Sequence, residues 1–210
     1  MKFNKLIAAT LTTAALTFGG AASAAIVVQE GNLPPLGGLV LSNKCDKSLI
    51  DGPALTVQGC LQNSESTVIN FTSNENISIS GGQAAIKAED NGFTYLSISL
   101  AALNATFDKL ILDIFSDVKG SVIFTGTPGG SSPSYTLKNG SNFFTITGDA
   151  GEGFNSIFFV TTNAVVTNLK QVRLSPTPGN EVPEPASLAL LGLGLVGIGA
   201  ARRLRKANKA

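Results

Sequence analysis

Short runs in which apolar and hydroxyl side chains alternate constrain the fold of this chain more than any other feature. In residues 96–100, leucine and isoleucine alternate with serine, and residues 77–80 repeat this alternation; Ala84, Ile86 and Ala88 continue the period of two. Successive side chains of a strand point to opposite faces, so each run predicts a half-buried β-strand with one polar face. Residues 110–115 are almost continuously apolar, which predicts a strand that is central or buried on both faces.

Turn-forming sequences rich in glycine, asparagine and proline separate these runs, and similar strand patterns continue to residue 174. Many short strands without a convincing soluble helix predict an all-β fold, specifically an antiparallel β-sandwich over residues 25–175. The pair Asn139-Gly140 suits a type I′ hairpin turn, and Asn91-Gly92 suits one as well. The apolar positions 169, 172 and 174 are offset from strict alternation, which predicts a β-bulge in the last strand.

The N-terminus has the pattern of a secretory signal peptide. Lys2 and Lys5 precede an apolar stretch at residues 6–18, and the small residues Ala22 and Ala24 then form a signal-peptidase site. We therefore expect residues 1–24 to be removed and the mature chain to begin at Ala25. A mature N-terminal helix is the alternative.

The C-terminus combines a rigid motif, an apolar run and a basic cluster. Pro183, Glu184 and Pro185 cannot continue a helix and are expected to stand exposed. Residues 186–201 carry no charge and would span roughly 24 Å as a helix, slightly less than a bilayer core. The basic residues that follow are expected to stay cytoplasmic and stop the span: Arg202, Arg203, Arg205 and Lys206. An ordinary C-terminal anchor is the alternative interpretation.

These three elements, in this order, resemble the PEP-CTERM sorting signal of Gram-negative bacteria. The resemblance covers residues 183–210, after a Pro-rich linker at residues 176–182. It implies a transient transmembrane helix at 186–201 and processing near Pro-Glu-Pro by an exosortase, a membrane transpeptidase-like enzyme. It also implies a cell-surface or matrix destination and an association with exopolysaccharide or biofilm. Residues 68–75, 92–96 and 168–174 resemble the jelly-roll-like ectodomains that precede such tails.

The mature region is mildly acidic and contains two cysteines. Residues 25–180 contain eight basic and twelve acidic side chains, a formal charge of −4, which disfavours nucleic acid as a partner. Cys45 and Cys60 are expected to form a disulfide in an exported chain. Two free thiols or a metal pair remain the alternative, although the absence of histidine argues against zinc.

No arrangement of residues in the sequence predicts catalysis, and no cofactor is expected. Without histidine, neither a Ser-His-Asp triad nor a Cys-His pair is possible. Carboxylate pairs for glycoside hydrolysis remain conceivable, but both sets suit solvated surface roles. The candidates are Glu89 with Asp90, and the series Asp108, Asp113 and Asp117.

Two binding functions stay open as alternatives to a non-enzymatic matrix protein. Candidate oxygen ligands for calcium are Glu89, Asp90 and Asn91 in one turn, and Asp149 and Glu152 in another, although neither turn matches a known calcium motif. For sugars, the expected exposed aromatic residues are Tyr95 and Tyr135, whereas the pairs Phe143/Phe144 and Phe158/Phe159 are expected in the core.

Overall fold

The computed structural model of the protein describes residues 25–31, 37–42, 45–46, 48–81, 83–149 and 152–177. All twelve regular elements with bounds in this part of the chain are β-strands, and every pairing between them is antiparallel. The expected all-β antiparallel fold is therefore confirmed. The strands are β1 (Ile26–Glu30), β2 (Gly38–Leu41), β3 (Ala54–Leu61), β4 (Ser64–Ser80), β5 (Ala85–Ala88), β6 (Tyr95–Leu100), β7 (Phe107–Ser116), β8 (Gly120–Thr127), β9 (Tyr135–Leu137), β10 (Gly140–Gly148), β11 (Ser156–Thr162) and β12 (Val166–Pro176).

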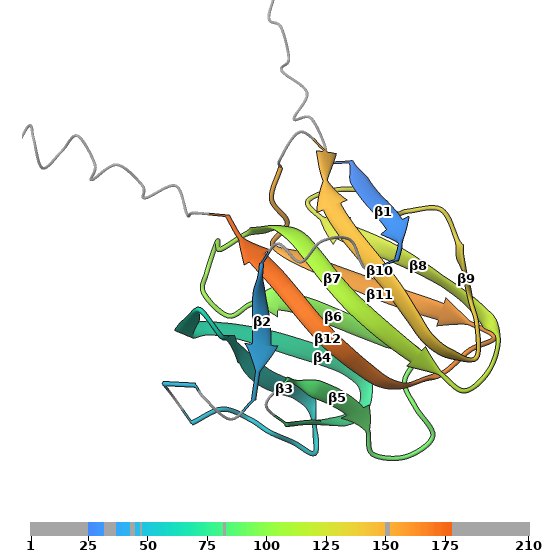
Figure 1. Ribbon diagram of the computed structural model, residues 1–210, viewed down its shortest axis with the longest axis horizontal. Helices are drawn as coiled ribbons and strands as arrows, with labels where there is room; N and C mark the ends of the chain where they lie inside the picture. Colours follow the sequence, from blue (N-terminus) through green and yellow to red (C-terminus); the bar gives the residue numbers. More distant parts are fainter. Residues whose placement is uncertain are drawn as a thin grey trace, which may run out of the picture.

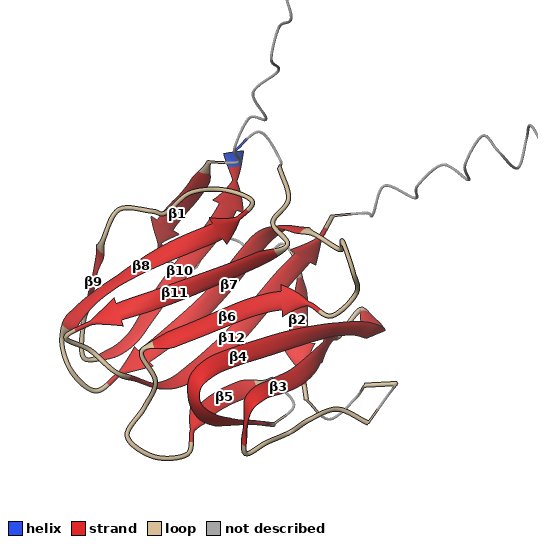
Figure 2. Cartoon of the chain, turned by 180° about the vertical axis from the view of Figure 1, so that it is seen from behind, coloured by secondary structure: helices blue, strands red, loops and turns tan. Residues whose placement is uncertain are grey.

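The strands belong to one hydrogen-bonded sheet that folds over its own core. Its order is β1-β10-β7-β12-β2-β3-β4-β6-β11-β8-β9, and β5 pairs with both β12 and β4. In Figure 1, strands β10, β7 and β12 lie in front of β8, β11, β6 and β4, and Figure 2 shows them from behind. We call β1, β10, β7 and β12 the β7 half, and β3, β4, β6, β11, β8 and β9 the β6 half. Strands β2 and β5 connect the two halves by hydrogen bonds.

The core lies between the two halves and is filled by the inward side chains of alternating residues. The ring centroid of Phe124 on β8 lies 5.0 Å from that of Phe144 on β10 and 6.0 Å from that of Phe159 on β11. Because β8 and β10 do not pair, the first contact joins the halves by side-chain packing. Residues 110–114 of β7 are all buried, as expected for a central strand between β10 and β12.

The predicted irregularity in the last strand is confirmed. The register of β12 against β7 shifts between Lys170 and Arg173. Gln171, within this shift, has a φ of 50°, in the left-handed region that side chains rarely adopt. The bulge explains why Val172 and Leu174 both reach the core although Leu169 precedes them at an odd spacing.

The two predicted hairpin turns are wrong. Strand β9 pairs with β8, whereas β10 pairs with β7 and β1, so the chain crosses between the halves at Asn139-Gly140. Asn91-Gly92 lies between β5 and β6, which do not pair with each other: β5 pairs with β4 and β12, and β6 pairs with β4 and β11. This turn therefore does not close a hairpin either. At the first crossing, the buried Asn142 side chain accepts the Lys138 N–H at 2.8 Å and donates to the Lys138 carbonyl at 2.9 Å. A side-chain amide thus replaces the ladder bonds of a hairpin.

Candidate functional site

The chain leaves the described β domain at a fixed point. Strand β12 ends at Pro176, and the N–H and the hydroxyl of Thr177 both donate to the Thr106 carbonyl, each at 2.9 Å. The two threonine hydroxyls also bond to one another. Beside this exit lies a groove of about 390 Å³ whose lining carries no charged side chain, and the adjacent Leu103 is 95% exposed. Figure 1 shows the exit at the end of β12.

The predicted targeting residues lie outside the described residues. This applies to the signal peptide with Ala22 and Ala24, to residues 183–185, to the span at 186–201 and to the basic residues 202–206. Ala25, the expected first residue of the mature chain, is exposed, and its carbonyl accepts the Asp149 N–H at 2.9 Å. In the described part of the chain, no helix has the length and apolar character needed to cross a membrane.

The predicted disulfide is present. Cys45 and Cys60 are joined with an S–S distance of 2.07 Å and a Cα–Cα distance of 5.7 Å. Cys60 is fully buried in β3 and packs with Leu39 and Leu41 of β2 in a second, smaller apolar cluster. The bridge therefore ties the segment after β2 to the sheet, and its role is structural.

The candidate carboxylates do not form a catalytic pair. Asp108 and Asp113 lie five positions apart on β7, hence on opposite faces, and Asp117 is exposed beyond the end of that strand. Asp113 is buried and accepts the backbone N–H of Asn142 at 3.0 Å. Glu89 accepts a hydrogen bond from the hydroxyl of Ser78 on β4, and the Asp90 carboxylate accepts one from the Asn91 N–H at 2.9 Å within its own turn.

The acidic turns do not collect metal ligands. In the parts of the chain that the structure describes, no three His, Cys, Asp or Glu side chains lie close enough together to hold a metal ion. The second turn is closed by a hydrogen bond from the Glu152 N–H to the Asp149 carbonyl at 3.1 Å. Neither turn therefore offers the six to eight oxygen ligands of a calcium site from its side chains alone.

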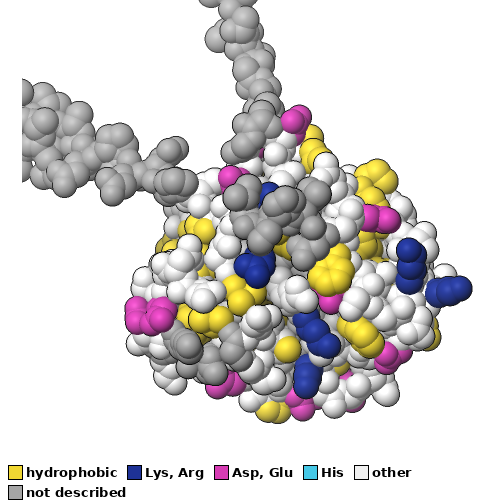
Figure 3. All heavy atoms as spheres, viewed as in Figure 1, with side chains coloured by type: hydrophobic (Ala, Val, Ile, Leu, Met, Phe, Trp, Pro, Cys, Tyr) yellow, Lys and Arg dark blue, Asp and Glu magenta, His cyan; other side chains and the backbone are white. Residues whose placement is uncertain are grey.

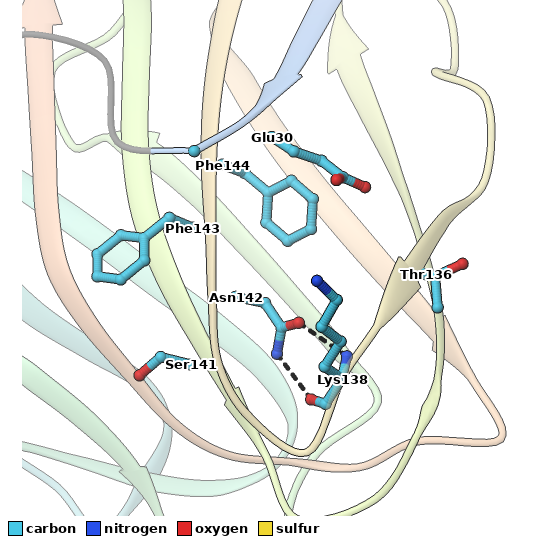
Figure 4. A pocket seen from close by; sticks show the side chains of 8 residues that line it. Glu30, Thr136, Lys138, Ser141, Asn142, Phe143 and Phe144 are labelled. Atoms are coloured by element: carbon cyan, nitrogen blue, oxygen red, sulfur yellow. Dashed lines mark hydrogen bonds between the residues drawn. The ribbon is translucent and has the colours of Figure 1, made fainter.

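A polar cleft of about 340 Å³ lies where β1 ends beside β10 (Figure 4). The Glu30 carboxylate enters it from the end of β1, and the Lys138 ammonium enters it from the β9–β10 connection. Ser141 and Phe143 line it as well, and the buried Asn142 fixes the Lys138 backbone. The cleft offers hydrogen bonds and two opposite charges to a small polar ligand, and Glu30 is the one acidic side chain among its described lining residues.

Two of the aromatic residues lie on the opposite side of the sheet from the one that the sequence analysis predicts: Tyr135 packs against the core, and Phe158 faces outward. The Tyr135 hydroxyl donates to the Val28 carbonyl at 2.9 Å, and its ring lies 5.8 Å from Phe144, so it packs against the core and offers no free platform. Tyr95 is half-buried on the outer surface of β6, and its ring centroid lies 5.7 Å from that of Phe158. Phe159 is in the core as expected, but Phe158 faces outward, because neighbours in a strand alternate.

Comparison with known proteins identifies the C-terminal segment. The family model of the PEP-CTERM protein-sorting motif matches residues 181–206. The chain is thus an all-β domain that carries a PEP-CTERM sorting signal, as its resemblance implied. The motif implies export, exosortase-dependent sorting to the envelope and a C-terminal membrane-anchored sorting signal, with an exosortase as processing partner. No curated protein and no solved structure matches the chain.

Proposed function

We propose that the protein is a non-enzymatic extracytoplasmic protein that an exosortase sorts and processes, and that it associates with exopolysaccharide or biofilm matrix. The observation that carries the proposal is the PEP-CTERM motif at residues 181–206, which begins four residues after Thr177 at the end of the β domain. Signal peptidase would remove residues 1–24, and the domain would reach the cell surface or the surrounding matrix.

The distribution of ionisable groups supports a non-enzymatic role. The chain contains no histidine, and Glu89, Asp90 and Asp113 each accept a hydrogen bond from a nearby hydroxyl or backbone N–H. General acid–base catalysis needs a titratable group within hydrogen-bond reach of the substrate and a partner to complete proton transfer. We interpret the folded sheet, with its two halves around one core, as a jelly-roll-like sandwich that acts as a binding or structural module.

Variants of the sorting motif test the proposal. Replacing both Pro183 and Pro185 by alanine should leave the β domain folded but stop processing, so that the uncut chain accumulates in the membrane. Deleting residues 183–210 should change localisation and leave the domain folded. Pro178→Ala is the matched control, because it makes the same substitution outside the three-residue motif. The readout is the C-terminal mass of the protein from membranes and medium, and unaltered processing and destination in the double variant would contradict the proposal.

A second candidate function is a carbohydrate-binding module, with or without calcium. It is favoured by the outward-facing pair Tyr95 and Phe158, because an aromatic face on a sheet surface can contact the apolar face of a sugar ring. A glycan array with and without calcium separates this function from a purely structural one. Silence under both conditions would count against it.

A further inference from the structure

The central outer surface of the β6 half lacks charge, in contrast to that of the β7 half. Strands β3, β6, β8, β9 and β11 contain no Asp, Glu, Lys or Arg, and the glutamates of β4 lie outside its central residues 68–73. The β7 half instead carries Lys109, Lys170 and Arg173, and Figure 3 shows basic side chains across that side of the molecule. Figure 2 looks onto the β6 half, where β8, β11, β6 and β4 lie side by side.

The strand register gathers outward side chains, all of them polar except Phe158, into two parallel rows on this surface; we call these the polar rows. Each row crosses five neighbouring strands, β8, β11, β6, β4 and β3, and therefore extends over roughly 19 Å at about 4.8 Å per strand. The first row is Thr125, Phe158, Ser97, Thr72 and Thr56. The second row is Thr127, Ser156, Ser99, Asn70 and Gln58.

Hydrogen bonds between row members hold some of these side chains in place. The hydroxyls of Thr56 and Thr72 are 2.9 Å apart, and the Gln58 amide nitrogen donates to the Asn70 amide oxygen at 3.0 Å. Each hydroxyl has one donor and two acceptor sites, so these contacts leave further sites for a ligand. A surface with pre-oriented donors and acceptors loses less side-chain entropy when it binds.

An apolar row runs beside the polar ones. Ile123, Val160 and Tyr95 are register partners on β8, β11 and β6, with Ile123 40% exposed and Val160 43% exposed. Tyr95 lies diagonally against Phe158 of the first polar row, which gives a compact apolar centre between hydroxyl groups. We call this centre, together with the two polar rows, the hydroxyl face.

We propose that the hydroxyl face binds an uncharged polysaccharide. Sugar rings present hydroxyls along their edges and apolar C–H groups on their faces, which matches hydroxyl rows beside an aromatic and aliphatic centre. An anionic polymer would find no cation on these strands, and a lipid surface would have to desolvate both polar rows. The inference rests on the proposed matrix association and specifies its chemistry as neutral.

A charge placed in the apolar row tests the inference. The probes are insoluble cellulose, insoluble β-1,3-glucan and starch as neutral glycans, and alginate as an acidic one. The full chain is solubilised in a polyoxyethylene detergent, whose head group contains no sugar, and bound protein is measured by co-sedimentation. Val160→Glu is compared with Val27→Glu, a matched control because Val27 is a 39% exposed strand valine on β1 of the β7 half.

The wild type and Val27→Glu should bind at least one neutral glycan, with little dependence on salt and no preference for alginate. Val160→Glu should weaken that binding at least tenfold, and Tyr95→Ala should weaken it about tenfold. The inference is overturned if no neutral glycan binds, if Val160→Glu binds like the control, if alginate is preferred, or if the face proves to join two copies of the chain in sedimentation analysis. Exosortase processing of Val160→Glu should be normal, so failure here is distinguishable from failure of the sorting proposal.

Discussion

Asn142 is the residue whose removal tests most directly why the chain crosses between the halves of the sheet. Its side chain is 8% exposed, accepts the Lys138 N–H, and donates to the carbonyls of Lys138, Gly140 and Ile114. We expect Asn142→Ala to keep the strands but to destabilise the protein, because a single amide satisfies the backbone of the whole connection.

The size of the effect follows from the groups that lose a partner. An unsatisfied buried N–H costs about 1–3 kcal/mol; the part-buried Lys138 N–H loses its acceptor at 2.8 Å, and the buried Asn142 amide is lost with it. The carbonyls near the surface can turn partly to water, and the backbone N–H of residue 142 can still bond to Asp113. We therefore expect a loss of about 2–3 kcal/mol. For a domain of this size, the loss corresponds to a decrease of about 5–10 °C in Tm.

Urea unfolding followed by far-ultraviolet circular dichroism measures this loss, with Asn139→Ala as the control. Asn139 is exposed, and its side chain donates a hydrogen bond to the Asp117 carbonyl at 2.6 Å, so its replacement should cost less than about 1 kcal/mol. If the two variants are equally stable, or if Asn142→Ala lies within about 0.5 kcal/mol of the wild type, the amide does not hold the crossing as we describe.

Two further predictions concern stability. Replacing Cys45 and Cys60 together by alanine should lower the free energy of unfolding by about 3 kcal/mol, because the bridge closes a loop with a sequence separation of 15. If dithiothreitol leaves the urea midpoint of the wild type unchanged, the disulfide does not stabilise the domain as expected. Gly126→Ala should cost about 1–3 kcal/mol, because the added Cβ would lie 2.6 Å from the Phe154 ring, whereas the control Gly130→Ala meets nothing within 4 Å. Equal thermal unfolding of these two glycine variants would refute the packing argument.

The sequence was sufficient for individual strands such as β6 and β7, but it did not resolve β1, β2 and β3 or identify which strands are neighbours. Alternation depends only on local geometry, so it located β6 and the bulge of β12, and continuous apolarity located the central β7. Pairing depends on contacts between distant segments, so Asn139-Gly140, a local hairpin signal, was misleading because Asn142 binds the backbone around it. The hydroxyl face has the same origin, since Ser97 becomes part of a row only through the registers of β4 and β11.

The position of the chain exit limits where the hydroxyl face can act before processing. Thr177 is fixed to Thr106, and the eight residues 178–185 lie between it and Ala186, so nine residue steps span at most about 30 Å. A domain of this size has a radius of gyration of about 15 Å, so its diameter exceeds about 30 Å. The segment of residues 178–185, which acts as a tether to the membrane, is therefore shorter than the domain diameter. While the apolar segment stays in the membrane, the face can reach only polymer within about one tether length plus one domain diameter of the bilayer. Cleavage near Pro183 would remove this limit, so sorting and the proposed polysaccharide binding would act in sequence, with processing setting the range over which the face binds.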